Sequence, residues 1–252
     1  MELYYKAFSE TGLGRKENED AIFCAENGGA GIFLVADGMG GHTDGARASG
    51  IIRDRIKIWW DRFLIYKKKP VFFQVVEEIR SVVEDANQEI FENTKKGKIC
   101  GSTVVLLWIQ ESAWAVFSCG DSRCYQVRKH IITGHVCQLT TDDVWENQQQ
   151  NVYGMSEVEI QSHAYFGCLI HAVGTKVNCS CSVQTNQLKG RMVFALCSDG
   201  IYRFCPEKYM KKQLKRAINI EKVEDCTEKI KAQVYQNKAP DNLSLIVVSI
   251  SV

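Results

Sequence analysis

The order of helical and strand-like segments constrains the fold of this chain more than any other feature. Two long amphipathic patterns with helical spacing follow each other directly, over residues 51–63 and, opened by a proline, over residues 70–97. Three short segments rich in β-branched or aromatic residues come next and predict a β-meander: 102–109, 114–119 and 123–127. Helices and strands therefore come in blocks rather than in strict alternation.

The remaining apolar runs extend this block pattern toward both ends of the chain. Residues 31–36 predict a buried strand that runs into the glycine-rich turn Asp37-Gly38-Met39-Gly40-Gly41. The later predicted elements are a strand, two helices and a final strand: 192–198, 207–218, 223–237 and 243–251. Segregated blocks of this kind predict an α+β fold in which antiparallel sheets are flanked by antiparallel helices.

Length and charge narrow the class of protein. A chain of 252 residues is long enough for one large domain, and we expect a single domain over residues 1–252. Thirty-one basic and thirty acidic residues leave a formal charge of +1, so neither a nucleic-acid partner nor an anionic membrane is indicated. The first ten residues do not resemble a signal peptide, and no apolar run is long enough to span a bilayer. We expect a soluble, cytoplasmic monomer.

Residues 143–174 form a polar, irregular stretch between the strand-rich middle and the next apolar run. Such a stretch is either a mobile flap or a surface loop, and composition alone favours the loop.

Acidic residues recur in one setting, at the end of an apolar strand or in the tight turn beside it. A single aspartate in that setting usually caps a helix or forms an Asx-turn, but this explanation is poor for the whole set. Glycine neighbours three of the sites, so the backbone can turn sharply there. The sites are Glu19-Asp20, Asp37, Asp121, Asp199 and Asp241.

Clustered carboxylates of this kind suit hard divalent cations. Mg²⁺ and Mn²⁺ prefer carboxylate, carbonyl and water oxygens, whereas zinc usually recruits histidine or cysteine. Two such ions sharing a water can lower its pKa toward neutrality and direct it at a phosphorus atom. Arg15, four residues before Glu19, could pair with phosphate oxygens, although a single arginine is more often a surface residue.

Taken in order, the short motifs around these residues resemble the type 2C metal-dependent protein phosphatases, the PPM family, and in particular its compact bacterial members. The resemblance covers nearly the whole chain. The motifs are Gly14-Arg15-Lys16-Glu17-Asn18-Glu19-Asp20, Val35-Ala36-Asp37-Gly38-Met39-Gly40-Gly41-His42, Gly101-Ser102-Thr103, Gly120-Asp121-Ser122-Arg123, Ala172-Val173-Gly174, Cys197-Ser198-Asp199-Gly200 and Asp241-Asn242.

The resemblance implies a fold and an activity. The fold is a central β-sandwich of two antiparallel sheets with a pair of helices on each outer face. The activity is hydrolysis of phosphoserine and phosphothreonine in proteins by a metal-bridging water, with two or three Mn²⁺ or Mg²⁺ ions. A bacterial serine/threonine kinase and its substrates are the implied partners, and residues 143–174 correspond to the flap.

The resemblance also implies a role for each site residue. Asp37 would bridge both metal ions, the Gly38 carbonyl would hold one of them, and Asp199 and Asp241 the other. Glu19 and Asp20 would act directly or through water, Asp121 would help to hold a third, weaker ion, and Arg15 would bind the substrate phosphate. Met39 stands where eukaryotic relatives have a histidine, so we hypothesise that His42 or a metal-bound water protonates the leaving group.

Two other functions are compatible with the same fold. One is a phosphoprotein-binding pseudoenzyme that has lost its metal ions, which the presence of Asp37, Asp199 and Asp241 disfavours. The other is a divalent-ion-binding protein without catalysis, which Arg15 makes less attractive.

Overall fold

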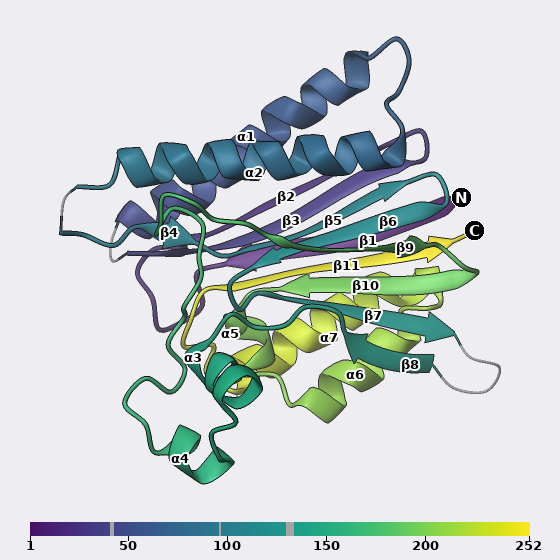
Figure 1. The fold of residues 1–252 in the computed structure, drawn as a ribbon. Coiled ribbons are helices and arrows are strands. Elements are labelled where there is room, and N and C mark those ends of the chain that lie inside the picture. Colours follow the sequence, from purple (N-terminus) through teal and green to yellow (C-terminus); the bar gives the residue numbers. More distant parts are fainter. Residues whose placement is uncertain (41–42, 96, 130–133) are drawn as a thin grey trace.

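The computed structural model describes residues 1–40, 43–95, 97–129 and 134–252. Its elements form four layers, in which two facing β-sheets lie between helices α1 and α2 on one side and helices α5, α6 and α7 on the other (Figure 1). The two chain termini lie close together at one end of the sheets (Figure 1). The sandwich of antiparallel sheets flanked by helices, expected from the sequence, is confirmed. The single-domain organisation of residues 1–252 stays a prediction.

All strand pairings among the described residues are antiparallel. The five-stranded sheet has the order β1 (Glu2–Glu10), β11 (Leu243–Ser251), β10 (Arg191–Cys197), β7 (Arg123–Lys129) and β8 (Gly134–Gln138). The second sheet has the order β2 (Asp20–Asn27), β3 (Ala30–Met39), β5 (Val104–Gln110), β6 (Ala113–Cys119) and β9 (Ser182–Gln187), with the short β4 (Gly101–Ser102) pairing to β3.

The long helices cover the outer faces of the sheets. Helices α1 (Thr43–Ile65) and α2 (Phe72–Glu92) pack on the second sheet, and α6 (Glu207–Arg216) and α7 (Val223–Gln236) on the five-stranded sheet. The shorter helices are α3 (Trp145–Gln148), the π-helical turn η1 (Gln149–Tyr153), α4 (Glu157–Gln161), α5 (Asp199–Tyr202) and the 3₁₀ turn η2 (Ile220–Lys222). Residues 143–174 thus contain short helices, and their role as a flap stays a prediction.

The central strands are apolar along their whole length because both of their faces are buried. In β5, Val104, Leu106 and Trp108 pack under α1 and α2, whereas Val105 and its alternate neighbours face the other sheet. Strand β11 repeats the pattern between α7 and the other sheet. A strand with a two-residue period and two buried faces must carry an unbroken apolar run, which is why these strands were predicted correctly.

The predicted β-meander is wrong at its third strand. Strands β5 and β6 pair with each other, but β7 pairs with β10 and β8 in the opposite sheet. The chain crosses between the sheets at Gly120, whose φ of +101° is a conformation that glycine adopts without strain. The crossing places Asp121 at the end of the sandwich rather than in a surface hairpin.

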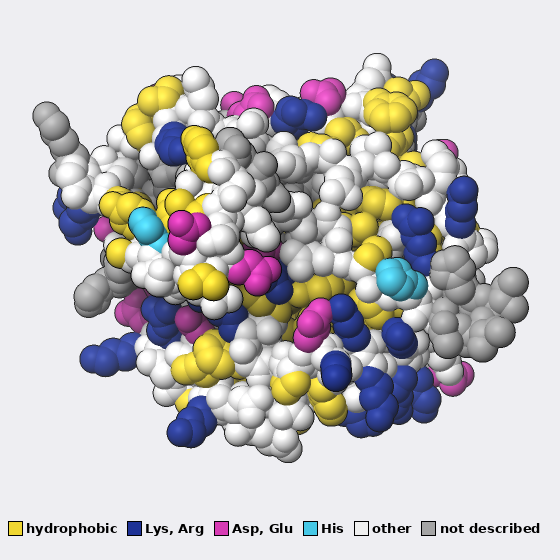
Figure 2. Space-filling view, turned by 60° about the horizontal axis from the view of Figure 1, so that its bottom comes forward, with side chains coloured by type: hydrophobic (Ala, Val, Ile, Leu, Met, Phe, Trp, Pro, Cys, Tyr) yellow, Lys and Arg dark blue, Asp and Glu magenta, His cyan; other side chains and the backbone are white. Residues whose placement is uncertain are grey.

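In the described part of the chain, no helix has the length and apolarity needed to cross a membrane. The face shown in Figure 2 carries acidic and basic side chains beside one another, with hydrophobic side chains exposed between them. This mixture agrees with the nearly balanced charge of the whole chain.

Candidate functional site

The two-residue period of the strands carries polar side chains into one end of the space between the sheets. Phe33 and Val35 of β3 face that space, so Asp37, two residues further, points the same way. Asp20 lies directly opposite Asp37 in the β2–β3 ladder. The apolar core between the sheets therefore ends in two facing carboxylates.

Asp20 is buried and held by two serine hydroxyls. Ser198, which follows β10, and Ser244 of β11 donate hydrogen bonds to its Oδ2 at 2.8 and 2.7 Å. Its Oδ1 is also buried, and among the described residues it has no hydrogen-bond partner. A buried carboxylate oxygen without a donor is costly unless a cation satisfies it.

The backbone around Asp37 and Gly38 is fixed on both sides. The Asp37 amide donates to Thr103 Oγ1 at 3.0 Å, and the Thr103 amide donates back to the Asp37 carbonyl at 2.8 Å. The Gly38 amide donates to the Glu19 carbonyl at 3.1 Å. Gly45 packs directly against Glu19 and Gly38. A Cβ built on Gly45 would lie 2.6 Å from Glu19 Oε1 and 2.9 Å from the Gly38 carbonyl oxygen. Only a glycine pair allows this approach.

The loop before β11 ties the two ends of the chain together at the site. Arg15 pairs with Asp241 through both carboxylate oxygens, with Nε–Oδ1 at 2.7 Å and Nη2–Oδ2 at 2.9 Å. Asn242 accepts a hydrogen bond from the Glu19 amide at 2.9 Å and donates to the carbonyls of Thr11 and Glu17. Asn242 thus positions the segment that contains Arg15 and Glu19.

Asp121 and Asp199 share one arginine. Arg203 lies 3.0 Å from Asp121 through Nη2 and 3.2 Å from Asp199 through Nε. Tyr202 OH adds a hydrogen bond to Asp121 Oδ2 at 3.2 Å. Asp199 is the first residue of α5, where the helix N-terminus favours a negative charge.

Burial and the charge of acidic neighbours disfavour the ionised forms of Asp20, Asp37 and Asp199. Burial is the main cause that raises the pKa of Asp37 well above its ordinary value, and the negative charges of Asp20, Asp199, Asp121 and Asp241 raise it further. Burial likewise raises the pKa of Asp20 to about 6, against the lowering effect of the two serine hydrogen bonds. Burial raises the pKa of Asp199 to about 6, which Arg203 partly opposes.

The carboxylates suit divalent cations in chemistry and number, but three of them form ion pairs with arginines instead. Among the described residues, no group of three His, Cys, Asp or Glu side chains converges closely enough to hold a metal ion as it stands. Arg15 holds Asp241, and Arg203 holds Asp121 and Asp199. The raised pKa values, the unsatisfied Asp20 Oδ1 and the all-oxygen donor set fit Mg²⁺ or Mn²⁺ once Asp241 is released from Arg15.

The metal-free protein is expected to lose stability as the pH rises from 4 to 6. The pKa values of Asp20 and Asp199 are about 6 in the folded chain and 3.8 ordinarily, so between these values the unfolded chain releases protons that the folded chain keeps. The free energy of unfolding then falls with pH, by on the order of 2 kcal/mol for each carboxylate. Urea unfolding of chelator-treated protein at several pH values measures this fall in the free energy of unfolding.

The matched variant for this pH series is Asp199→Asn, which cannot ionise. Its free energy of unfolding should fall less between pH 4 and 6 than that of the unaltered chain. If the free energy of unfolding fell equally with pH in both proteins, ionisation of Asp199 would not destabilise the folded chain.

The structure brings together Arg15, Glu19, Asp20, Asp37, Gly38, Asp121, Asp199 and Asp241 of the residues predicted from sequence. His42 lies outside the described residues. Sequence reasoning assigned no role to Thr103, Ser198, Asn242, Tyr202 or Arg203. Asp199 and Arg203 stand four residues apart, a spacing that signals a contact along a helix, but the other contacts join distant segments.

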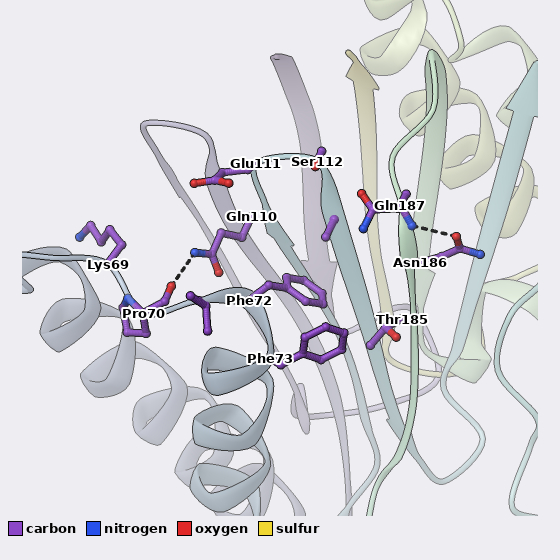
Figure 3. A pocket seen from close by; sticks show the side chains of 12 residues that line it. Lys69, Pro70, Phe72, Phe73, Gln110, Glu111, Ser112, Thr185, Asn186 and Gln187 are labelled. Atoms are coloured by element: carbon purple, nitrogen blue, oxygen red, sulfur yellow. Dashed lines mark hydrogen bonds between the residues drawn. The ribbon is translucent and has the colours of Figure 1, made fainter.

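One cavity lies beside the carboxylates and another lies far from them. A cavity of about 190 Å³ beside Asp241 is lined by Arg15, Lys16, Glu17 and Glu19. A cavity of about 330 Å³ lies between the start of α2 and the edge strand β9, lined by Phe72, Phe73 and Gln110 among others (Figure 3). Gln110 pairs with Ala30 at the opposite end of β3 from Asp37, and this cavity contains no carboxylate cluster.

The chain is similar to known phosphatases along most of its length. The family model described as Protein phosphatase 2C matches residues 15–235. The serine/threonine phosphatase stp of Listeria monocytogenes is 26% identical, with 95% of this chain and 93% of that protein covered.

Solved structures share the fold. Stp1, a serine/threonine phosphatase from Staphylococcus aureus, superposes with a TM-score of 0.81 at 24% identity, covering 100% of this chain and 96% of that chain. The catalytic domain of the serine/threonine protein phosphatase PstP, solved in complex with two manganese ions, gives a TM-score of 0.78 at 21% identity, covering 99% of each chain.

Proposed function

The chain belongs to the protein phosphatase 2C family, and from this premise we propose that the carboxylate site hydrolyses phosphoserine and phosphothreonine in proteins with the help of divalent cations. The observation that carries the proposal is the facing pair Asp20 and Asp37, whose ionisation is opposed by burial and by their acidic neighbours. Bound cations would stabilise the ionised carboxylates, which burial and repulsion otherwise disfavour.

Two Mn²⁺ or Mg²⁺ ions would be held by Asp37, the Gly38 carbonyl, Asp199 and Asp241, with Glu19 and Asp20 acting directly or through water. Such ions supply Lewis acidity toward phosphate oxygens and lower the pKa of water toward neutrality. The backbone hydrogen bonds of Asp37 and Gly38 keep the predicted ligands in position before any ion arrives. This preorganisation reduces the reordering that binding requires.

Arg15 is the proposed ligand for the substrate phosphate. Its side chain is 49% exposed and lines the cavity beside Asp241, so it can turn from that carboxylate toward a bound phosphate. A guanidinium pairs with phosphate oxygens through two parallel hydrogen bonds. When Asp241 instead binds a cation, Arg15 is free to make that contact.

The proposed substrates are phosphorylated proteins, including a bacterial serine/threonine kinase and its targets. The basis for the substrate class is the similarity to the Listeria serine/threonine phosphatase stp. A monomeric state and a cytoplasmic location complete the proposal, as expected from the sequence.

The proposal is tested by hydrolysis of a phosphothreonine peptide with and without Mn²⁺. We expect phosphate release that requires Mn²⁺ and falls at least about a thousand-fold in Asp199→Ala, because loss of a direct ligand should exceed the 10–100-fold cost of losing an outer partner. Asp85→Ala, which removes an exposed aspartate from α2, is the matched control and should retain full activity.

No phosphate release from a folded protein that has bound Mn²⁺ would favour the pseudoenzyme alternative. Metal binding without turnover of even a small aryl phosphate would instead favour a divalent-ion-binding protein without catalysis.

A further inference from the structure

The guanidinium of Arg203 lies between the carboxylates of Asp121 and Asp199, beside the proposed metal pair. Its Nη2 is 3.0 Å from Asp121 Oδ2 and its Nε is 3.2 Å from Asp199 Oδ2. The three residues come from the crossing between β6 and β7, the first residue of α5 and the residue that follows α5. One cation from the chain thus satisfies two carboxylates on different segments.

The carboxylate of Asp121 is held firmly at this position. Tyr202 donates a hydrogen bond to it, and the Tyr202 ring stacks against the Arg123 guanidinium, whose carbon lies 3.6 Å from the ring centroid. Arg123 is fixed in turn by Asp142, which accepts hydrogen bonds from its Nε and Nη2. Asp121 therefore cannot easily withdraw from Asp199 when its cationic partner changes.

The space between Asp121 and Asp199 is attractive for a cation. The two carboxylate side chains are only 11% and 18% exposed, so water screens their charges poorly. A divalent ion and a guanidinium cannot occupy this space together. Arginine stays charged at all working pH values, and its covalent attachment keeps it close to the carboxylates.

We propose that Arg203 is a resident cation that fills the position between Asp121 and Asp199, so that the enzyme takes up two divalent ions and not a third. This inference rests on the proposed metal-dependent function and concerns the number of ions at that site. Arg203 is a positioning residue, because the proposal has it act through the carboxylates of Asp121 and Asp199 that it contacts. It also departs from the third-ion role that the family resemblance implies for Asp121.

The test counts bound Mn²⁺ by equilibrium dialysis and elemental analysis for the unaltered chain, Arg203→Gln and Arg203→Lys. The unaltered chain should saturate with two ions, and Arg203→Gln should bind a third with a dissociation constant of about 1 mM, typical of weak oxygen-only sites. Arg203→Lys keeps the positive charge and should still bind two. Because Arg203 is 46% exposed, each variant is expected to fold, and circular dichroism verifies this.

The double variant Asp121→Asn/Arg203→Gln locates the additional ion. It should return to two ions, because the vacated position then lacks one carboxylate. A third ion in the unaltered chain at the same Mn²⁺ concentration, or only two ions in Arg203→Gln, would overturn the inference while leaving the phosphatase proposal intact. An unaltered chain that binds no Mn²⁺ would overturn both.

Discussion

Replacing Asp37 by asparagine is expected to remove phosphatase activity and, at the same time, to stabilise the metal-free protein. Activity on a phosphothreonine peptide should fall at least about a thousand-fold, since Asp37 is one of the residues that would hold the ions. The stability should rise because burial and four neighbouring acidic residues oppose ionisation of Asp37, and asparagine has nearly the same shape without the charge. A gain of only about 1 kcal/mol would raise the melting temperature by about 2–4 °C.

The two effects separate a functional carboxylate from a structural one. Melting temperatures are measured at pH 7.5 with a chelator and with Mn²⁺, and the chelated Asp37→Asn protein should melt above the chelated parent. Mn²⁺ should stabilise the parent more than the variant, since binding to the folded state alone raises stability. Asp61→Asn, on the exposed face of α1, should alter neither property. A chelated variant that melts below its parent would contradict the proposed charge repulsion.

Replacing Gly38 by alanine is expected to destabilise the fold and to weaken metal binding together. A Cβ at this position would overlap the Gly45 carbonyl and lie 2.6 Å from the Glu19 carbonyl oxygen. Both obstacles are backbone atoms, so the start of α1 or the end of β3 must move. Overpacking of this kind costs about 3 kcal/mol or more, which corresponds to a fall in melting temperature of about 6–12 °C.

Gly50→Ala provides the matched control for this substitution. Gly50 lies within α1, and among the described residues the contact that its Cβ would make within 4 Å is with Arg53 Nη2 at 3.9 Å. Alanine should stabilise the helix there by about 0.5–1 kcal/mol, because it has the higher helix propensity. Differential scanning calorimetry should therefore show a lower melting temperature for Gly38→Ala and a higher one for Gly50→Ala than for the unaltered chain. A Gly38→Ala protein with the same melting temperature as its parent would show that α1 or β3 can move without loss of stability.

The strands that sequence reasoning missed all lie at sheet edges. Strands β1 and β8 bound the five-stranded sheet, and β2 and β9 bound the other. An edge strand has a neighbour on one side and fewer buried side chains, so its apolar pattern is weak; β9, for example, reads SVQTNQ and is mostly exposed. Strand β11, buried on both faces, was predicted with its observed bounds, Leu243–Ser251.

The two-faced burial of the central strands and the carboxylates at strand ends could be predicted from the sequence, because both follow from local periodicity and turn chemistry. Three features could not be predicted in this way: β7 joins the opposite sheet, Asn242 holds the Glu19 amide across 223 residues of chain, and Arg203 pairs with Asp121 as well as with Asp199. These contacts join distant segments, and packing of the two sheets against each other, rather than any local preference, brings their atoms within bonding distance.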